Sequence, residues 1–120
     1  SVVYRNGKLW GTQTIFLPSS SPNRSAVQAW EINPTGLVVN QSIRVDDNTA
    51  TQHYYFPSIA VNVNNDVLLG FSQSSATTFG SCSYSLRLGT YASGTIDSPY
   101  LYKAGVAKYF KTYRGFKAIL

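Results

Sequence analysis

Charge is scarce in this sequence, and acidic side chains are scarcer than basic ones. Charged residues make up 12% of the 120 residues, which is about half the usual share. Five Asp and Glu stand against ten Lys and Arg, so the formal net charge is +5. Because helical surfaces normally alternate Lys, Arg and Glu, this composition disfavours a helical protein. The hydrophobic content of 43% in turn excludes a disordered chain.

The chain also has a single cysteine and no long apolar run. Cys82 cannot form a disulfide within the chain, and one cysteine excludes a zinc site built from cysteine pairs. It lies in residues 81–86, where the pattern predicts a strand with a buried thiol. A helix needs about 20 apolar residues to cross a bilayer, and no apolar run approaches that length. The sequence therefore predicts no membrane span.

Aromatic and turn-forming residues are abundant instead. Nine Tyr and six Phe accompany many Ser, Thr and Asn, a composition typical of strands and turns. Helical spacing does not persist over three turns anywhere. Turn signals at 33–36 and 64–66 separate runs with strand character. The sequence therefore predicts an all-β fold, with strands at residues 2–4, 9–17, 25–32, 37–45, 55–63, 67–72, 81–88 and 99–103.

These strands repeat along the chain. Residues 1–11 align with 58–70, and residues 25–32 align with 81–88, which gives a period of roughly 56–59 residues with four strands in each period. Such a period is typical of the blades of a β-propeller. A β-sandwich formed by duplication has the same pattern and stays open as the alternative.

The repeat predicts a first blade at 1–53, a second at 54–106 and the truncated start of a third at 107–120, where Tyr109-Phe110 repeats Tyr55-Phe56. We thus expect antiparallel four-stranded β-meander blades that form a partial β-propeller. Because strand-like segments reach both ends of the sequence, we expect the chain to be part of a longer protein, and the absence of a signal peptide then indicates little about its compartment.

One strand favours blades over a sandwich. Val67-Leu68-Leu69-Gly70-Phe71 is a continuous apolar run, whereas a strand with one wet face alternates apolar and polar residues. The run predicts that the 59–71 hairpin is covered on both faces. Neighbouring blades would provide that cover.

The segment Tyr54-Tyr55-Phe56-Pro57-Ser58-Ile59-Ala60-Val61-Asn62, followed by an apolar Gly70-Phe71-Ser72 strand, resembles the repeat of secreted bacterial β-propeller proteins with a sialidase-like fold. The resemblance implies an extracellular or cell-surface location. Two features depart from that group. The Asp-box turn typical of sialidases is absent, and residues 116–120 stand where the group continues towards a Trp-Gly-Asp-Tyr-Ser motif.

No catalytic constellation is visible, so the sequence favours a non-enzymatic role. A glycosidase needs two carboxylates that face one bond, but the acids form no obvious pair and are typical of turns; they are Glu31, Asp46, Asp47, Asp66 and Asp97. His53 is the single histidine and lacks the motif of a nucleophilic triad. Metal-ligand spacings and phosphate loops are absent as well, and we expect no metal and no cofactor.

A basic cluster occupies the C-terminal part of the sequence without any nucleic-acid-binding motif. Its members alternate with aromatic residues after a strand, and we interpret them as a solvated surface rather than a nucleic-acid site. They are Lys103, Lys108, Lys111, Arg114 and Lys117.

The segment 52–57 is the best candidate for a binding site. If residues 58–61 form the innermost strand of a blade, His53, Tyr54 and Tyr55 enter at the mouth of the propeller channel, where aromatic rings stack on sugars. Packing of the same residues between blades is the alternative. The sequence thus predicts a non-catalytic segment of an extracellular β-propeller, structural or binding a glycan or a protein, that associates with further blades or with itself. A fragment of a sialidase-like glycoside hydrolase is the alternative.

Overall fold

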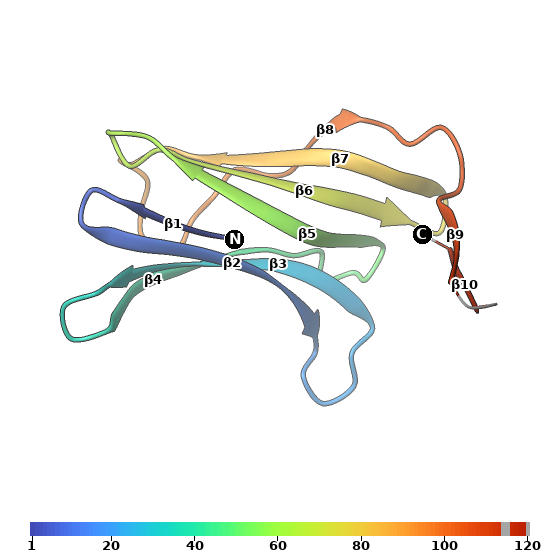
Figure 1. Cartoon of the computed structure of the whole chain (residues 1–120), viewed down its shortest axis with the longest axis horizontal. Coiled ribbons are helices and arrows are strands. Elements are labelled where there is room, and N and C mark those ends of the chain that lie inside the picture. Colours follow the sequence, from blue (N-terminus) through green and yellow to red (C-terminus); the bar gives the residue numbers. More distant parts are fainter. Residues whose placement is uncertain (114–115, 120) are drawn as a thin grey trace.

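The structure of the chain is a computed structural model that describes residues 1–113 and 116–119. Within these residues it contains strands and no helix (Figure 1). Two four-stranded antiparallel sheets follow each other along the chain, and a two-stranded hairpin comes last. The first sheet contains β1 (Val2–Arg5), β2 (Lys8–Leu17), β3 (Arg24–Asn33) and β4 (Val38–Val45). The second contains β5 (Gln52–Val61), β6 (Val67–Ser75), β7 (Thr78–Arg87) and β8 (Tyr100–Lys103).

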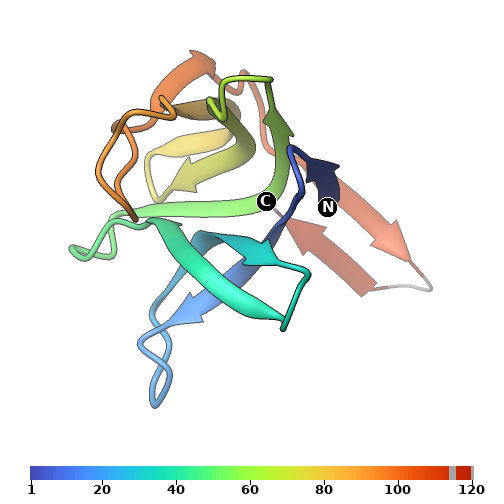
Figure 2. The same cartoon turned by 90° about the vertical axis from the view of Figure 1, so that its left-hand side faces the viewer.

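Each sheet is a meander in which consecutive strands are neighbours. The predicted all-β fold with four-stranded antiparallel units is therefore confirmed. The two sheets are open, and this arrangement is compatible with part of a propeller and with a sandwich. Figure 2 shows the molecule from the left-hand side of Figure 1, and in this view the second sheet lies above the first.

The first hairpins of the two sheets correspond to each other. Val3 pairs with Trp10 in the first sheet, as Ile59 pairs with Leu69 in the second. The amide of Asn6, in the turn of the first hairpin, donates a hydrogen bond to Oδ1 of Asn65 in the turn of the second, at 2.8 Å. Both asparagines have positive φ (53° and 61°), which Asn tolerates better than most residues. The equivalent turns of the two repeats therefore lie side by side.

One core lies between the two sheets. The first sheet contributes a tryptophan and small or branched side chains, and the second contributes larger ones. The buried residues are Trp10, Val27, Ala29, Ile43 and Val45 from the first sheet, and Tyr54, Ile59, Val67, Leu69 and Phe71 from the second. Burial of this apolar surface is the dominant stabilising contribution that joins the sheets.

Within the described residues, the 59–71 hairpin is covered on one face only, and the cover predicted for its other face is not supplied by this chain. Leu69 on the inner face is fully buried, but Leu68 on the outer face is 43% exposed. Leu86, which pairs with Leu68 across β6 and β7, is 38% exposed. The first sheet covers only one side of the hairpin. A continuous apolar run identifies an apolar strand, but it does not determine how many neighbouring sheets cover it.

The prediction of a buried thiol at Cys82 is wrong, because Cys82 is exposed. Strand β7 turns its serines towards the core and its larger apolar residues outwards, the reverse of the usual alternation. The hydroxyl of Ser83 donates to Gln73 Oε1 at 2.7 Å, and the hydroxyl of Ser81 donates to the Phe79 carbonyl at 2.7 Å. The hydroxyls of Ser81 and Ser83 are thus satisfied, and small polar side chains are tolerated at these two positions. The buried hydroxyl of Ser85 has no partner among the described residues.

The boundaries of the repeats differ slightly from the prediction. Strand β5 begins at Gln52, three residues before the predicted strand, so the expected boundary between residues 53 and 54 falls inside β5. In the segment expected to begin a third blade, β9 (Phe110–Tyr113) pairs with β10 (Phe116–Ile119) in a hairpin that extends from one end of the molecule (Figure 1). Residues 114, 115 and 120 lie outside the described part. Within that part, no helix is long and apolar enough to span a membrane.

Candidate ligand-binding site

A β-bulge interrupts β5 at the segment singled out by the sequence. The register of β5 against β6 shifts between Tyr55 and Ser58, so one extra residue is inserted in β5. Pro57 lies within the shift and has no N–H to contribute to the ladder. Phe56 takes up the distortion with φ of +54°, in the left-handed region. The bulge thus turns the Phe56 side chain out of the regular alternation of the strand.

A contact with the first sheet fixes the unusual conformation of Phe56. Its backbone N–H donates to Oγ1 of Thr14, on β2, at 3.0 Å. The left-handed conformation costs an L-residue roughly 1–2 kcal/mol, and it is uncommon for a bulky side chain. The ring itself gains little burial in return, because Phe56 is 69% exposed. The fold therefore holds an aromatic ring in solvent at a conformational cost.

The exposed ring forms part of a groove between the two sheets, which we call the junction groove. Its volume is about 410 Å³. The Tyr55 and Phe56 rings meet edge to face within it, with centroids 5.2 Å apart. The second sheet supplies His53, Tyr55, Phe56 and Ser74 to the lining, and the first sheet supplies Thr14, Phe16 and Ser25. The groove thus combines three aromatic rings with an imidazole and hydroxyl groups.

The structure separates the three residues predicted as ligand-binding. His53 and Tyr55 lie on the same side of β5 and both line the junction groove. Tyr54 points the other way and is buried in the core, where its ring meets Phe71 edge to face at 5.4 Å. Burial, reinforced by the negative charge of Asp47, raises the pKa of the Tyr54 phenol. Tyr54 therefore fits the alternative interpretation, packing between the sheets.

Sequence reasoning missed the residues that the first sheet contributes to the groove. Phe16 and Thr14 are about forty residues away from Phe56 along the chain, and only the packing of the two sheets brings them together. The conformation of Phe56 was also missed. The Phe56-Pro57 dipeptide inside an otherwise apolar strand was the available signal, because proline within a strand marks an edge or a bulge.

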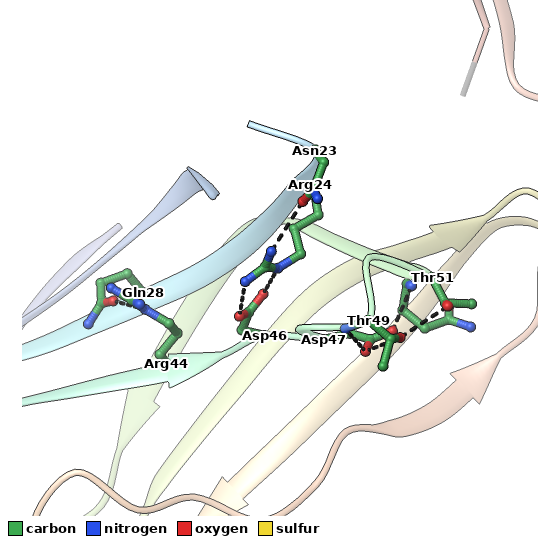
Figure 3. Close-up of polar contacts among 9 residues, drawn as sticks. Asn23, Arg24, Gln28, Arg44, Asp46, Asp47, Thr49 and Thr51 are labelled. Carbon is green, nitrogen blue, oxygen red and sulfur yellow. Dashed lines mark hydrogen bonds and ion pairs between the residues drawn. The ribbon is translucent and has the colours of Figure 1, made fainter. Parts of the chain in front are cut away.

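The loop between β4 and β5 positions the N-terminal end of β5 through two aspartates (Figure 3). Arg24 on β3 forms a bidentate ion pair with Asp46, with Nε–Oδ1 and Nη2–Oδ2 distances of 2.7 and 2.8 Å. Asp47 accepts hydrogen bonds from the Thr49 hydroxyl at 2.6 Å and from the Gln52 N–H at 2.9 Å. These bonds hold the pKa of Asp47 below its ordinary value. Both aspartates thus have structural partners at the entrance to the strand that carries the groove.

A second polar pair in the same region crosses the first sheet. Arg44 on β4 donates from Nε to Oε1 of the buried Gln28 on β3 at 2.8 Å (Figure 3). The amide of Gln28 thereby gains a charge-assisted hydrogen bond. This pair stabilises the sheet to which β2 belongs, and β2 carries Thr14.

The other aspartates also serve the fold. Asp66 accepts from the Gly89 N–H at 2.8 Å and from the Asn62 amide at 2.9 Å, and the first of these bonds is the main cause of its lowered pKa. Asp97 accepts from the Tyr91 hydroxyl at 3.0 Å, which raises the pKa of that phenol. Within residues 1–113 and 116–119, no group of three or more His, Cys, Asp and Glu side chains is placed to hold a metal ion. The chemistry that the groove does offer is ring stacking and hydrogen bonding.

Comparison with known proteins gives no relative for this chain. No protein-family model matches it, and no curated protein and no solved structure matches it either. The resemblance to sialidase-like propellers therefore stays a prediction from the sequence motifs. What the chain does has to be inferred from the geometry of the junction groove.

Proposed function

We propose that the chain is a non-catalytic segment of an extracellular β-propeller protein and that its junction groove binds a glycan. The observation that carries the proposal is Phe56, an exposed aromatic residue held in the left-handed conformation at a bulge. Strain of this kind persists where the surrounding structure imposes it, and it concentrates at ligand sites. A ring that stabilises the core very little is then retained for a contact with something outside the chain.

The chemistry of the groove suits a sugar. Sugar rings present C–H-rich faces that pack on aromatic side chains, while their hydroxyls need donors and acceptors at the edges. Phe16, Tyr55 and Phe56 provide the apolar surface, and His53 and Ser74 provide polar groups beside it. An apolar surface with a few well-placed polar groups is the usual composition of a small-ligand site.

The outer face of the second sheet supports the assignment to a longer propeller. Leu68, Leu86 and Ala60 are exposed there, while the serines of β7 face inwards. A sheet face that stays exposed to water normally carries polar side chains, and the apolar side chains of the same strands point towards the core. A further four-stranded sheet of the same repeat would cover this apolar face as the second sheet covers the first. The extracellular, bacterial setting follows from the sequence resemblance.

A fragment of a sialidase-like hydrolase is the second candidate, and the described residues favour it less. Hydrolysis of a glycosidic bond requires two carboxyl groups that flank the scissile bond. Asp46, Asp47, Asp66 and Asp97 all have structural partners, and none of them lines the junction groove. Binding without catalysis accounts for the groove with the residues present.

The test replaces Phe56 by glycine and measures oligosaccharide binding by calorimetry. Phe56→Gly removes the ring and suits the positive φ, so the fold should be retained while affinity falls by about tenfold, equivalent to about 1.4 kcal/mol for one lost stacking contact. Tyr4→Ala is the matched control, because Tyr4 is an equally exposed aromatic residue on β1 outside the groove. Unchanged binding by Phe56→Gly, or an equal loss in both variants, would overturn the proposal.

A further inference from the structure

A second cavity adjoins the junction groove at the turn between β6 and β7. Its volume is about 610 Å³. His53 and Ser74 line both cavities, so the two hollows share a wall. The remaining lining residues are Ser75, Ala76, Thr77, Thr78, Phe79 and Lys108. We call this second hollow the turn cavity.

The turn cavity is rich in hydroxyl groups that belong to one tight turn. Ser75 and Thr78 close the β6–β7 ladder, and Thr77 lies between them. The Thr77 N–H donates to the Ser75 hydroxyl at 3.2 Å, and the two hydroxyl oxygens are 3.3 Å apart. These bonds fix the direction of the side chains while each hydroxyl keeps capacity for a further hydrogen bond. The turn therefore presents a fixed group of hydroxyls to the cavity.

The charged side chain in the combined lining of the two cavities is basic. Lys108, whose side chain ends in an ammonium group, lines the turn cavity, and no acidic side chain is among the described residues that line either hollow. Within the described part of the chain, the one ion pair joins Arg24 and Asp46. Lys108 therefore has no carboxylate partner among the described residues. An ammonium group beside hydroxyl donors, in a lining without acidic side chains, is complementary to an anion.

We infer that the ligand of this site is an anionic saccharide that occupies both hollows. One sugar ring stacks on Phe16, Tyr55 and Phe56 in the junction groove. The carboxylate or sulfate of the adjoining unit lies against Lys108 and the hydroxyls of the β6–β7 turn. This inference rests on the proposed glycan-binding function and adds the charge of the ligand to it.

The experiment compares neutral and anionic forms of the same oligosaccharides by calorimetry. The probes are glucan, galactan and N-acetylglucosamine oligomers, each in a neutral, a carboxylated and a sulfated form. We expect the anionic form of the bound backbone to bind about three- to tenfold more tightly than its neutral form, as a partly exposed ion pair would give. The difference should shrink when the salt concentration rises from 50 to 500 mM, because salt screens exposed charges. The carboxylated and sulfated arms identify which anion the turn cavity accepts.

Two lysine variants locate the effect. Lys108→Gln should abolish the preference for the anionic form, whereas Lys8→Gln, which lowers the net charge equally at the start of β2, should leave it intact. Equal affinity for neutral and anionic forms, or an equal response of the two variants, would refute the anionic ligand while the glycan-binding function stands. A preference that depends on Lys108 but not on Phe56 would instead refute the proposed junction groove.

Discussion

Adjacent leucines on β6 give a direct test of how the second sheet is covered. Leu69 faces the core and is 0% exposed, while Leu68 faces outwards and is 43% exposed. Leu69→Ala removes fully buried methyl groups and leaves a cavity, which should cost about 3 kcal/mol of the free energy of unfolding. Leu68→Ala removes groups that are only partly out of water and leaves no enclosed cavity, so about 1 kcal/mol is expected.

Urea denaturation monitored by fluorescence measures both variants against the unsubstituted chain. The midpoint should fall much further for Leu69→Ala than for Leu68→Ala, at an unchanged slope, because the slope reports the surface exposed on unfolding. The two substitutions remove the same atoms from neighbouring residues, so each is the control of the other. Equal losses would refute the reasoning, since they would mean that the outer face of the sheet is as well covered in solution as the inner face.

Two further predictions concern acid stability and the contact that fixes the bulge. Asp47 and Asp66 have lowered pKa values in the folded chain, so each contributes stability above its unfolded pKa of about 3.9, and this contribution is lost as the pH falls through the lower folded value. The midpoint of thermal melts should therefore fall as the pH drops below about 4. In the double variant Asp47→Asn/Asp66→Asn this fall of the midpoint should be smaller. An identical dependence of the midpoint on acid pH in both proteins would contradict the stabilising role of these two carboxylates. Thr14→Val removes the acceptor of the Phe56 N–H and should weaken oligosaccharide binding with a loss of about 1 kcal/mol in stability. Thr12→Val, two residues earlier, removes a buried hydroxyl that has no partner among the described residues and should be neutral or stabilising. Equal effects of the two valine substitutions, measured by calorimetry and denaturation, would show that the Thr14 contact does not fix the site.

Local sequence patterns were sufficient for the strands and turns. Each strand predicted between residues 2 and 103 has an observed counterpart in the same order. The turn at Asn64-Asn65-Asp66 was predictable because Asn tolerates the positive φ that Asn65 adopts. Alternation and turn chemistry act over a few residues, and these are the features that a single sequence displays.

Packing between sheets was beyond the reach of such patterns. The residues at 81–86 show an alternation that predicted a buried Cys82, but the structure places the serines inside and Cys82 outside. Alternation determines which side chains share a face, but it does not determine which face meets the neighbouring sheet. For the same reason, the sequence did not indicate that Leu68 is exposed on the outer face of the sheet.

The candidate site was found in part. The sequence singled out the segment that holds His53, Tyr55 and Phe56, and the structure brings these three residues together in a groove. Tyr54 was included because it is adjacent in sequence, although the alternation of the strand sends it into the core. Phe16 was not predictable, because its place in the groove depends on the way the two sheets pack.

The most direct test of the binding site is a nuclear magnetic resonance titration of the labelled chain with the oligosaccharide that binds most tightly. The amide resonances of Phe16, Tyr55 and Phe56 should shift together and saturate at one ligand per chain, while those around Leu68 on the outer face stay unchanged. Shifts confined to the outer face, or spread evenly without saturation, would contradict a glycan site at the junction of the two sheets.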